Sequence, residues 1–303
     1  MKLVLFEHEG STQPGVLAGD GVVSAAHLAG TIPAIIDGFA ELREELEACT
    51  ERSPIPLDAV ALRAPIPRPR TILCAIANYW EHAQRDPRPL HMYVKNPDAV
   101  IGPGDTIVLP ETTAPWIFMH EAELALVFRG PTAPTPPERW RDVVFGYTGL
   151  IDVSARGHGR TSWGDFSWLG KSFDTFCPIG PCVVTADEIP DPNDLHVRMW
   201  NDGQLRHDYN TDDMEHRVPE LVAFATARVS LCSGDLIACG TNHEGLGPLQ
   251  DGETVVQEIA GIGRLTVGVR DPLGRSWDRG VYMGADSTNP AAVARWAAGD
   301  EGG

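Results

Sequence analysis

Short apolar runs bounded by turn residues recur along most of the chain and predict a mixed α/β fold that is mostly β. Glycine-containing stretches such as "GPGD" at 102–105 and "QDGE" at 250–253 are typical of tight turns. Apolar residues at helical spacing predict one clear helix over 214–229. The runs with the length and composition of strands are "TILCAIA", "AELALVF", "VVFGYTGLIDV", "GPCVVTA", "HVRMWNDG", "GDLIACG", "ETVVQEI" and "RLTVGVRD".

The chain divides near residue 65. Before this point, short strands joined by Gly-Asp turns lead into apolar and acidic residues at helical spacing, which continue to about Ser53. The proline-rich stretch "SPIPLDAVALRAPIPRPR" that follows is typical of a linker. We therefore expect a small N-terminal α+β domain over 1–65, a catalytic domain over 66–280 and a C-terminal tail over 281–303.

The composition narrows the class of protein. The 303 residues are 43% hydrophobic and 22% charged, as in an ordinary globular protein with a substantial core. A formal net charge of −18 argues against nucleic-acid and membrane partners, which need cationic surfaces, but leaves an anionic substrate open. The six cysteines lack CxxC spacing, and "MKLVLFEHEG" carries no signal-peptide core. These features predict a cytoplasmic protein with reduced thiols.

The stretch "HEAELALV" places Glu121 and Glu123 at the head of an apolar run. On a strand, residues i and i+2 point to the same face, so both carboxylates would point the same way. Two like charges this close raise each other's pKa unless a cation lies between them. The pair is therefore either an exposed acidic face or part of a metal site.

A third carboxylate comes from "GYTGLIDVSAR", where an apolar strand ends in Asp152. If this strand end lies beside the Glu-x-Glu strand, the three side chains form a site of oxygen ligands. Such a site suits a hard ion, Mg²⁺ or Mn²⁺, and Ca²⁺ as well. Zinc is not expected, because "HEAEL" is not the HExxH motif and no cysteine has ligand spacing.

Three further segments carry candidate catalytic or binding residues. Lys171 in "GKSFDTF" is either a solvated surface lysine or a fixed cation for a developing oxyanion. His82 in "NYWEHAQRD", a short helix or a lid, is either a general base or merely a polar residue. The glycine-rich turn "CGTNHEGLG" is suited to present Thr241 and backbone N–H groups to a carboxylate, with Asn242 as a second candidate for substrate binding.

The order of these motifs resembles that of the fumarylacetoacetate hydrolase family. The motifs "NYxxHA", "VKNPDAVIGPGD", "HEAELALV", "GYTGLIDVSAR", "GKSFDTF", "SGDLIACGT" and "GETVVQEIAGIGRL" occur in the family's order over about residues 70–270. The resemblance implies a mixed β-roll core in a homodimer. It also implies that Mg²⁺ or Mn²⁺ is held by Glu121, Glu123 and Asp152.

The resemblance assigns further roles by position. Lys171 matches the family's active-site lysine, His82 its lid histidine and Thr241 its substrate-contacting threonine. One departure lies three residues after His82, where many members carry a glutamate that orients the histidine. This chain has Arg85 there, which cannot accept an imidazole proton.

Other carboxylates are therefore candidates to orient the lid histidine. Asp86 lies at i+4 and is well placed on a helix, whereas Glu81 would be poorly placed. Glu244 in "TNHEGLG" is a further candidate, because that loop differs from the family's commoner sequence.

A second departure follows "DVSAR", where "GHGRTSWGD" offers His158 and Arg160 in place of the family's glutamine. An arginine at 160 suits a substrate that carries a carboxylate.

The resemblance implies a divalent-metal-dependent hydrolase that cleaves a C–C bond in a small 2-oxo or 1,3-dicarbonyl acid, through an enolate held at the metal. The substrate would be of the acylpyruvate or fumarylacetoacetate type. The alternative on the same metal site is a decarboxylase of the oxaloacetate type, a hydratase or an isomerase, since decarboxylation tolerates a weakened histidine pair. A catalytically idle binding protein is a third interpretation, which so many buried charges oppose.

Overall fold

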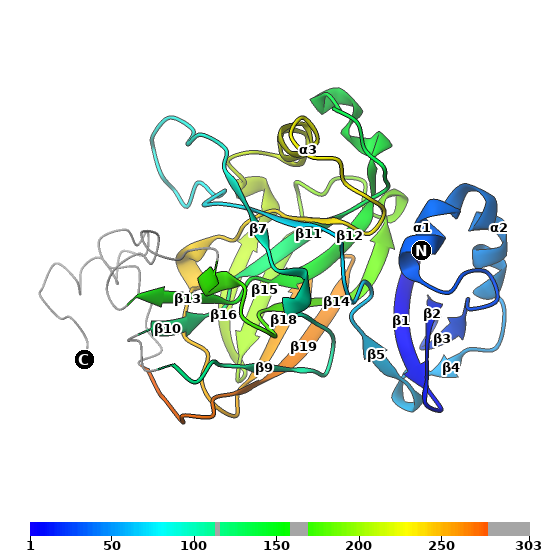
Figure 1. The fold of residues 1–303 in the computed structure, drawn as a ribbon, viewed down its shortest axis with the longest axis horizontal. Helices are drawn as coiled ribbons and strands as arrows, with labels where there is room; N and C mark the ends of the chain where they lie inside the picture. The colour runs from blue at the N-terminus through cyan, green and yellow to red at the C-terminus, as the bar shows by residue number, and fades with distance from the viewer. Residues whose placement is uncertain (113–115, 158–168, 278–303) are drawn as a thin grey trace, which may run out of the picture.

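The computed structural model describes residues 1–112, 116–157 and 169–277. Within these residues the chain forms a twelve-stranded sheet, a five-stranded sheet, a two-stranded ribbon and three α-helices. Figure 1 shows the N-terminal strands and helices gathered at one end, with the rest of the chain built around the two larger sheets. The fold is thus mixed α/β and mostly β, as the apolar pattern predicts.

The N-terminal unit packs two helices against a small group of strands. The helical pattern is interrupted at Gly38 and ends at Cys49 rather than near Ser53. The proline-rich stretch that predicts a linker contributes two short strands, which pair with the first and third strands. The elements are β1 (Lys2–His8), β2 (Ser11–Ala18), β3 (Gly21–Ser24), α1 (Ile32–Asp37), α2 (Phe39–Cys49), β4 (Ile55–Pro56) and β5 (Ala61–Arg63).

The large sheet continues from this unit into the body of the protein. Its body strands are β6 (Ile72–Ala75), β7 (Met92–Lys95), β8 (Val100–Ile101), β11 (Ala122–Phe128), β12 (Val144–Ile151), β14 (Cys177–Thr185) and β17 (Leu236–Ala238). The order along its main path is β4-β3-β2-β1-β14-β12-β11-β17-β6-β7. Because β1 pairs with β14, one hydrogen-bonded sheet joins the N-terminal unit to the body.

The five-stranded sheet covers one face of the large sheet. It contains β9 (Thr106–Val108), β15 (His196–Asn201), β16 (Gln204–Asn210), β18 (Thr254–Ile259) and β19 (Gly263–Arg270), in the order β16-β15-β18-β19-β9. A separate ribbon pairs β10 (Trp116–Met119) with β13 (Ser154–Gly157). The main core is shared by both sheets, so that Met199 of β15 and Leu126 of β11 belong to the same buried cluster.

Strand β11 is buried on both faces, which explains its continuous apolar run. Leu124 and Leu126 point into the main core. Ala125 and Val127 point the other way, into a second core that also contains the apolar side chains of α1. Because side chains alternate along a strand, Glu123 shares the face of Ala125 and Val127.

The predicted helix over 214–229 is shorter in the structure. Helix α3 runs from Val218 to Thr226, after a single 3₁₀ turn over Thr211–Asp213. Pro219 lies in its first turn, where a proline is tolerated because it has no N–H to satisfy. In the interior of a helix that began at residue 214, the same proline would lack a backbone N–H and would clash with the preceding turn, which accounts for the later start.

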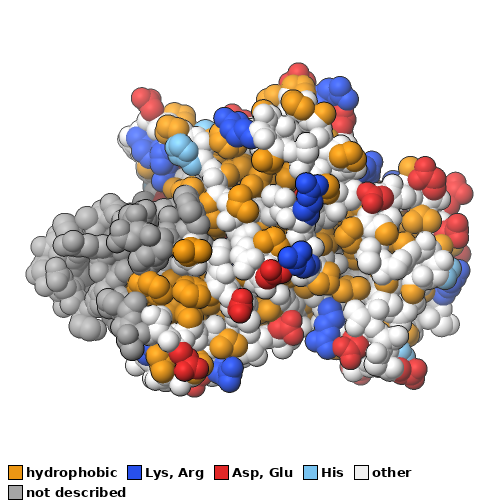
Figure 2. All heavy atoms as spheres, in the orientation of Figure 1, with side chains coloured by type: hydrophobic (Ala, Val, Ile, Leu, Met, Phe, Trp, Pro, Cys, Tyr) orange, Lys and Arg blue, Asp and Glu red, His pale blue; other side chains and the backbone are white. Residues whose placement is uncertain are grey.

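The surface carries much of the acidic excess of the sequence. Figure 2 shows acidic side chains gathered over the N-terminal unit at the right of the view. Four glutamates of α2 are exposed there along the helix, namely Glu41, Glu44, Glu45 and Glu47. No helix in the described part of the chain has the length and apolarity that crossing a membrane requires.

The segment 80–88 forms turns instead of a helix. Glu81 and His82 have left-handed backbone conformations, with φ of 51° and 61°, which an α-helix does not accept. Nη2 of Arg85 lies 2.6 Å from Oε2 of Glu215, and Nε of Arg88 lies 3.0 Å from the same oxygen. The Glu215 side chain is 1% exposed, so both arginines anchor the segment to a buried carboxylate.

Replacing Glu215 with glutamine should loosen this segment and destabilise the protein. Burial alone would raise the Glu215 pKa, but hydrogen bonds from Arg85 and Arg88 outweigh it and lower the pKa to about 2. A lowered carboxyl pKa contributes stability above its ordinary value of 4.5, which is lost as the pH falls towards 2. Both arginines are about a third exposed, so solvent screens part of the effect.

Urea unfolding measures this loss. The Glu215→Gln variant should have a free energy of unfolding lower by roughly 1–2 kcal/mol at pH 7, and the difference should shrink at pH 3. Glu220→Gln, at an exposed glutamate of the same region, is the matched control and should change little. Equal losses in the two variants would contradict the anchoring role.

Candidate active site

Five neighbouring strands of the large sheet have ends that lie side by side. This row of strand ends, which runs across the strands, is the edge of the sheet at which the candidate site lies. Strands β12, β11 and β17 are antiparallel neighbours, and β6 runs parallel to β17. The start of β11 therefore lies beside the ends of β12, β17 and β6, and β7 returns from the same edge. The candidate site is built from the residues at these ends.

Glu121, Glu123 and Asp152 meet at this edge. Glu121 precedes β11 and Glu123 lies on it, while Asp152 follows β12 and donates its backbone N–H to the Glu121 carbonyl at 2.8 Å. One carboxylate oxygen from each residue lies within 4.8 Å of the others, and all three residues are buried. The structure thus brings the three predicted ligands together, and the exposed acidic face is excluded.

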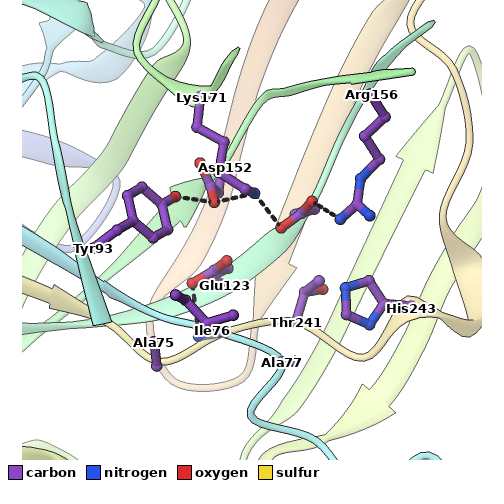
Figure 3. A pocket seen from close by; sticks show the side chains of 12 residues that line it. Ala75, Ile76, Ala77, Tyr93, Glu123, Asp152, Arg156, Lys171, Thr241 and His243 are labelled. Carbon is purple, nitrogen blue, oxygen red and sulfur yellow. Dashed lines mark hydrogen bonds and ion pairs between the residues drawn. The ribbon is translucent and has the colours of Figure 1, made fainter. Parts of the chain in front are cut away.

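A lysine and an arginine neutralise part of this buried charge (Figure 3). Nζ of Lys171 lies 2.9 Å from Oε2 of Glu121 and 2.7 Å from Oδ2 of Asp152. Nη2 of Arg156 lies 2.5 Å from Oε1 of Glu121. Lys171 ends the 3₁₀ turn η4 (Leu169–Lys171), and its side chain is only 7% exposed, so it is not a solvated surface lysine.

Strand β7 contributes two further partners of Asp152. The Tyr93 hydroxyl donates to Oδ2 at 2.5 Å, and Nζ of Lys95 lies 2.6 Å from Oδ1. Lys95 also donates to the backbone carbonyl of Lys171. The side chain of Lys95 has no exposed surface, so its contact with Asp152 compensates a fully buried cation.

The electrostatic environment differs among the carboxylates. Burial opposes ionisation of Glu121, but Lys171 and Arg156 outweigh it and hold the Glu121 pKa well below its usual range. For Glu123, burial together with the charges of Asp152 and Glu121 raises the pKa well above its usual range. Burial also opposes the charge of Lys171, but Asp152 and Glu121 outweigh it and raise the Lys171 pKa.

Glu123 is the carboxylate whose ionised form an added cation would stabilise most. Its Oε2 accepts the backbone N–H of Gly240 at 2.7 Å, and no lysine or arginine among the described residues forms an ion pair with it. A divalent cation between the carboxylates would offset the repulsion that raises its pKa. The donor set is entirely carboxylate, and each of the six cysteines is free and outside it. These residues fit a hard ion such as Mg²⁺ or Mn²⁺.

His82 forms an exposed pair with Glu244. Nε2 of His82 lies 3.3 Å from Oε1 of Glu244, and the two side chains are 85% and 37% exposed. Glu244 is thus the candidate carboxylate that contacts His82 in the structure. Neither residue lines the pocket of the acidic triad.

Glu81 turns to the interior, unlike its neighbour His82. Its Oε1 lies 2.5 Å from Nδ1 of His243, which lines the pocket beside Thr241. The poor placement expected of Glu81 assumes a helix, and the left-handed turn at 81–82 removes that assumption. Between the segments 81–82 and 243–244 the sequence therefore predicts one histidine–carboxylate pair, and the structure has two.

The predicted substrate-binding residues have different surroundings. Thr241 is buried and lines the triad pocket. The side chain of Asn242 instead stabilises the loop that contains it. Its Nδ2 donates to Oδ2 of Asp213 at 3.1 Å, and its Oδ1 accepts the backbone N–H of Glu244 at 2.9 Å. A substrate contact by Asn242 stays a prediction. His158 and Arg160 lie outside the described residues.

Four residues around the triad were not predicted, and two sequence signals point to them. Ser154 and Arg156 follow Asp152 at intervals of two on the way into β13, and both contact Glu121. Tyr93 and Lys95 show the same alternation in "MYVK" on β7. The alternation predicts that each pair shares a face, but not that this face meets the triad.

A family model and a curated relative both match most of this chain. The family model described as fumarylacetoacetate (FAA) hydrolase C-terminal matches residues 71–270. The chain is 34% identical over 260 residues to an oxaloacetate tautomerase, fahd2, a mitochondrial protein of Xenopus laevis, with 80% of this chain and 79% of the relative covered.

Solved structures agree with the fold. A maleylpyruvate hydrolase from Sphingobium sp. SYK-6 matches with a TM-score of 0.79 and 33% identity, covering 89% of this chain and 100% of that one. The same hydrolase, solved with manganese(II) and pyruvate, gives a TM-score of 0.80. A 2-hydroxyhepta-2,4-diene-1,7-dioate isomerase from Mycobacterium marinum gives 0.72 at 30% identity, covering 90% of this chain and 99% of that one. The matches confirm the predicted fold class.

Divalent ions should stabilise the protein through the triad. Addition of Mg²⁺ or Mn²⁺ should raise the melting temperature, and EDTA should lower it to that of the ion-free protein, because only the folded state assembles the three carboxylates. Differential scanning fluorimetry measures both shifts. The absence of a shift in either direction would count against a metal site.

Glu123→Gln separates the metal site from the fold. Glutamine keeps an oxygen for the Gly240 N–H but removes a charge that the neighbouring carboxylates repel. The variant should therefore lose the ion-dependent rise in melting temperature while its ion-free form melts no lower than the wild type. A lower melting temperature for the ion-free variant would show that the ionised carboxylate is a structural requirement.

Proposed function

The chain belongs to the fumarylacetoacetate hydrolase family, and on this premise we propose that it is a divalent-metal-dependent enzyme that hydrolyses a C–C bond in a small 2-oxo or 1,3-dicarbonyl acid. The observation that supports this most is the shared pocket, in which three buried carboxylates and a buried lysine meet Thr241. Mg²⁺ or Mn²⁺, held by Glu121, Glu123 and Asp152, would supply Lewis-acid polarisation of substrate oxygens.

Lys171 supplies a fixed positive charge in this pocket. Two carboxylates and the Ser154 hydroxyl hold its Nζ, so the cation is oriented before a substrate arrives. A preorganised charge in a water-poor site stabilises a developing anion more than the same charge in water. We assign Lys171 to the enolate that remains when the C–C bond breaks.

Hydrolysis also needs a base for water, and we assign this role to His82 with Glu244. The Glu244 carboxylate can accept a proton from the imidazole at the 3.3 Å separation. Arg85 stands where many family members have the orienting glutamate, and it forms an ion pair with buried Glu215 instead. We assign Thr241, which is buried and lines the pocket, to the orientation of a substrate carboxylate.

An enzyme of the decarboxylase, tautomerase or isomerase type is the second candidate. It is favoured by the 85% exposure of the His82 side chain and by its position outside the pocket. Reactions that only form and protonate an enolate need no activated water, so they do not depend on this histidine. The relatives include both an oxaloacetate tautomerase and a dioate isomerase, which supports the same view.

A catalytically idle protein is disfavoured by the energetics of the site. Burying several charges costs several kcal/mol per ion unless geometry and hydrogen bonding compensate, and apolar residues would fill the same space at less cost. The homodimer and the cytoplasmic location stay predictions. The Xenopus laevis relative is mitochondrial, so the comparison does not support the predicted location.

A substrate screen with Mn²⁺ tests the proposal directly. Purified protein should cleave at least one acylpyruvate, and Glu123→Gln should not, because it lacks a metal ligand. Oxaloacetate and sugar-derived 2-oxo acids complete the panel. Turnover of oxaloacetate alone would support the second candidate, and no metal-dependent turnover in any assay would contradict both.

His82→Ala discriminates between the two candidates. The variant should lose hydrolysis by about 100-fold or more, the usual contribution of a general base, while metal-dependent decarboxylation of oxaloacetate changes little. Product formation from both substrates, measured side by side, gives the ratio. Equal losses in both reactions would remove the water-activating role from His82.

A further inference from the structure

Glu81 and His243 form a second histidine–carboxylate pair, which is buried. Nδ1 of His243 lies 2.5 Å from Oε1 of Glu81, and the same oxygen accepts the backbone N–H of His243 at 2.7 Å. The side chains are 13% and 7% exposed. Figure 3 shows the His243 ring beside Thr241 and Arg156, on the opposite side of the pocket from Tyr93.

Two short turns create both pairs. The left-handed backbone at Glu81 and His82 directs the first side chain inward and the second outward. Opposite them, His243 and Glu244 begin the 3₁₀ turn η7 (His243–Gly245). The inner residue of each turn contacts the inner residue of the other, and the two outer residues form the exposed pair.

Asp213 fixes the two turns relative to each other. Its Oδ2 accepts the backbone N–H of Glu81 at 3.1 Å and the side-chain amide of Asn242 at 3.1 Å. Trp80 also donates its backbone N–H to the Asp213 carbonyl at 3.0 Å. The buried pair therefore rests on a hydrogen-bonded frame and does not depend on exposed side chains.

The geometry determines which nitrogen of His243 faces a reactant. Burial opposes ionisation of Glu81, but the hydrogen bonds from His243 outweigh it and lower the Glu81 pKa. An ionised carboxylate only accepts hydrogen bonds, so Nδ1 carries the proton. Nε2, to which no described residue hydrogen-bonds, is left as the basic nitrogen of the neutral ring.

We propose that His243 transfers the proton at C3 of the bound 2-oxo acid and that Glu81 is its positioning residue. This inference rests on the proposed function, because it needs a 2-oxo acid in the triad pocket. The C3–H bond breaks, the proton passes to Nε2, and the electron pair stays on the substrate as the enolate. The reverse transfer returns a proton to C3 and restores the neutral ring, so no other reactant is consumed.

The buried pair and the exposed pair therefore serve different steps. Proton transfer at C3 is common to hydrolysis, decarboxylation and tautomerisation, since each forms or consumes an enolate of a 2-oxo acid. Activation of water is needed by hydrolysis alone. The titratable and charged groups that face His243 are Glu81 from its own pair, Glu121 from the start of β11 and His207 from β16, with Arg156 of β13 lining the same pocket.

Deuterium exchange at C3 of pyruvate tests the transfer. An enzyme that protonates an enolate must also be able to remove the same proton. The wild-type protein with Mg²⁺ in D₂O should therefore exchange the methyl hydrogens of pyruvate for deuterium. Proton NMR measures the loss of the methyl signal. His243→Asn should slow the exchange by about 100-fold or more, with unchanged affinity for Mn²⁺. His196→Asn is the matched control at an exposed histidine 2.5 Å from Asp208, and it should exchange like the wild type.

Glu81→Gln tests the positioning role. Glutamine keeps an oxygen for the backbone N–H of His243 but removes the negative charge beside the ring. The imidazolium is then less stabilised, so the acid limb of the exchange-rate profile should move to lower pH. A purely structural contact would lower the melting temperature without moving that profile. This variant keeps His243 in place and decides the question even if His243→Asn does not fold.

The outcomes separate this inference from the function on which it rests. If the His243→Asn variant exchanged C3 hydrogens as fast as the wild type, the role of His243 would be overturned. If the pH profile of Glu81→Gln were unshifted, the positioning role of Glu81 would be overturned. A wild-type protein that binds Mn²⁺ but exchanges no C3 hydrogen would overturn the proton transfer and leave the metal site intact. A wild-type protein that binds no Mn²⁺ would overturn the proposed function itself.

Discussion

The burial of three carboxylates at one sheet edge is the constraint on which the rest of the site depends. Like charges at this spacing repel, and removing each from water costs several kcal/mol. Three cations, Lys95, Lys171 and Arg156, compensate this charge, and each lies within hydrogen-bond distance of at least one of the carboxylates. These cations pair with Glu121 and Asp152, and none of them forms an ion pair with Glu123. An apolar core of similar volume would be cheaper, so the arrangement is best explained by the chemistry that the charges perform.

The sequence predicts those parts of the site that depend on local geometry. The alternation of side chains along a strand places Glu121 and Glu123 on one face, and a carboxylate at a strand end supplies Asp152. Two of the three cations come from distant segments, since Lys95 precedes Asp152 by 57 positions and Lys171 follows it by 19. Nothing local indicates that β7 and the turn before β14 reach the same edge. Their proximity depends on the order of strands in the sheet, which the apolar pattern alone does not determine.

The lid segment shows a different limit of prediction from sequence. The spacing argument that ranks Asp86 above Glu81 is correct for a helix, where positions i and i+4 share a face. Residues 81 and 82 adopt left-handed backbone conformations, which are uncommon for residues other than glycine and carry no marker in the sequence. Once the backbone turns in this way, adjacent side chains point in opposite directions. The loop "TNHEGLG" attracts notice as a departure from the family pattern, but the partner of His243 is found only when both turns are placed in space.

The two histidine pairs suggest how the proposed metal site would support several reactions. In the proposed function the carboxylates and their cations determine whether an enolate can form, and the carboxylates lie on strands of the large sheet or directly beside them. The exposed pair, which we assign to water, does not line the pocket, although the same two turns hold the buried pair. Changes in the outer residues of those turns, His82 and Glu244, therefore alter the activation of water without disturbing the buried charges. Arg85 fits this view, because its charge is committed to Glu215 and leaves the pocket unaffected. In such a design hydrolysis depends on the outer residues of the turns, whereas the enolate chemistry depends on the sheet and on the buried pair.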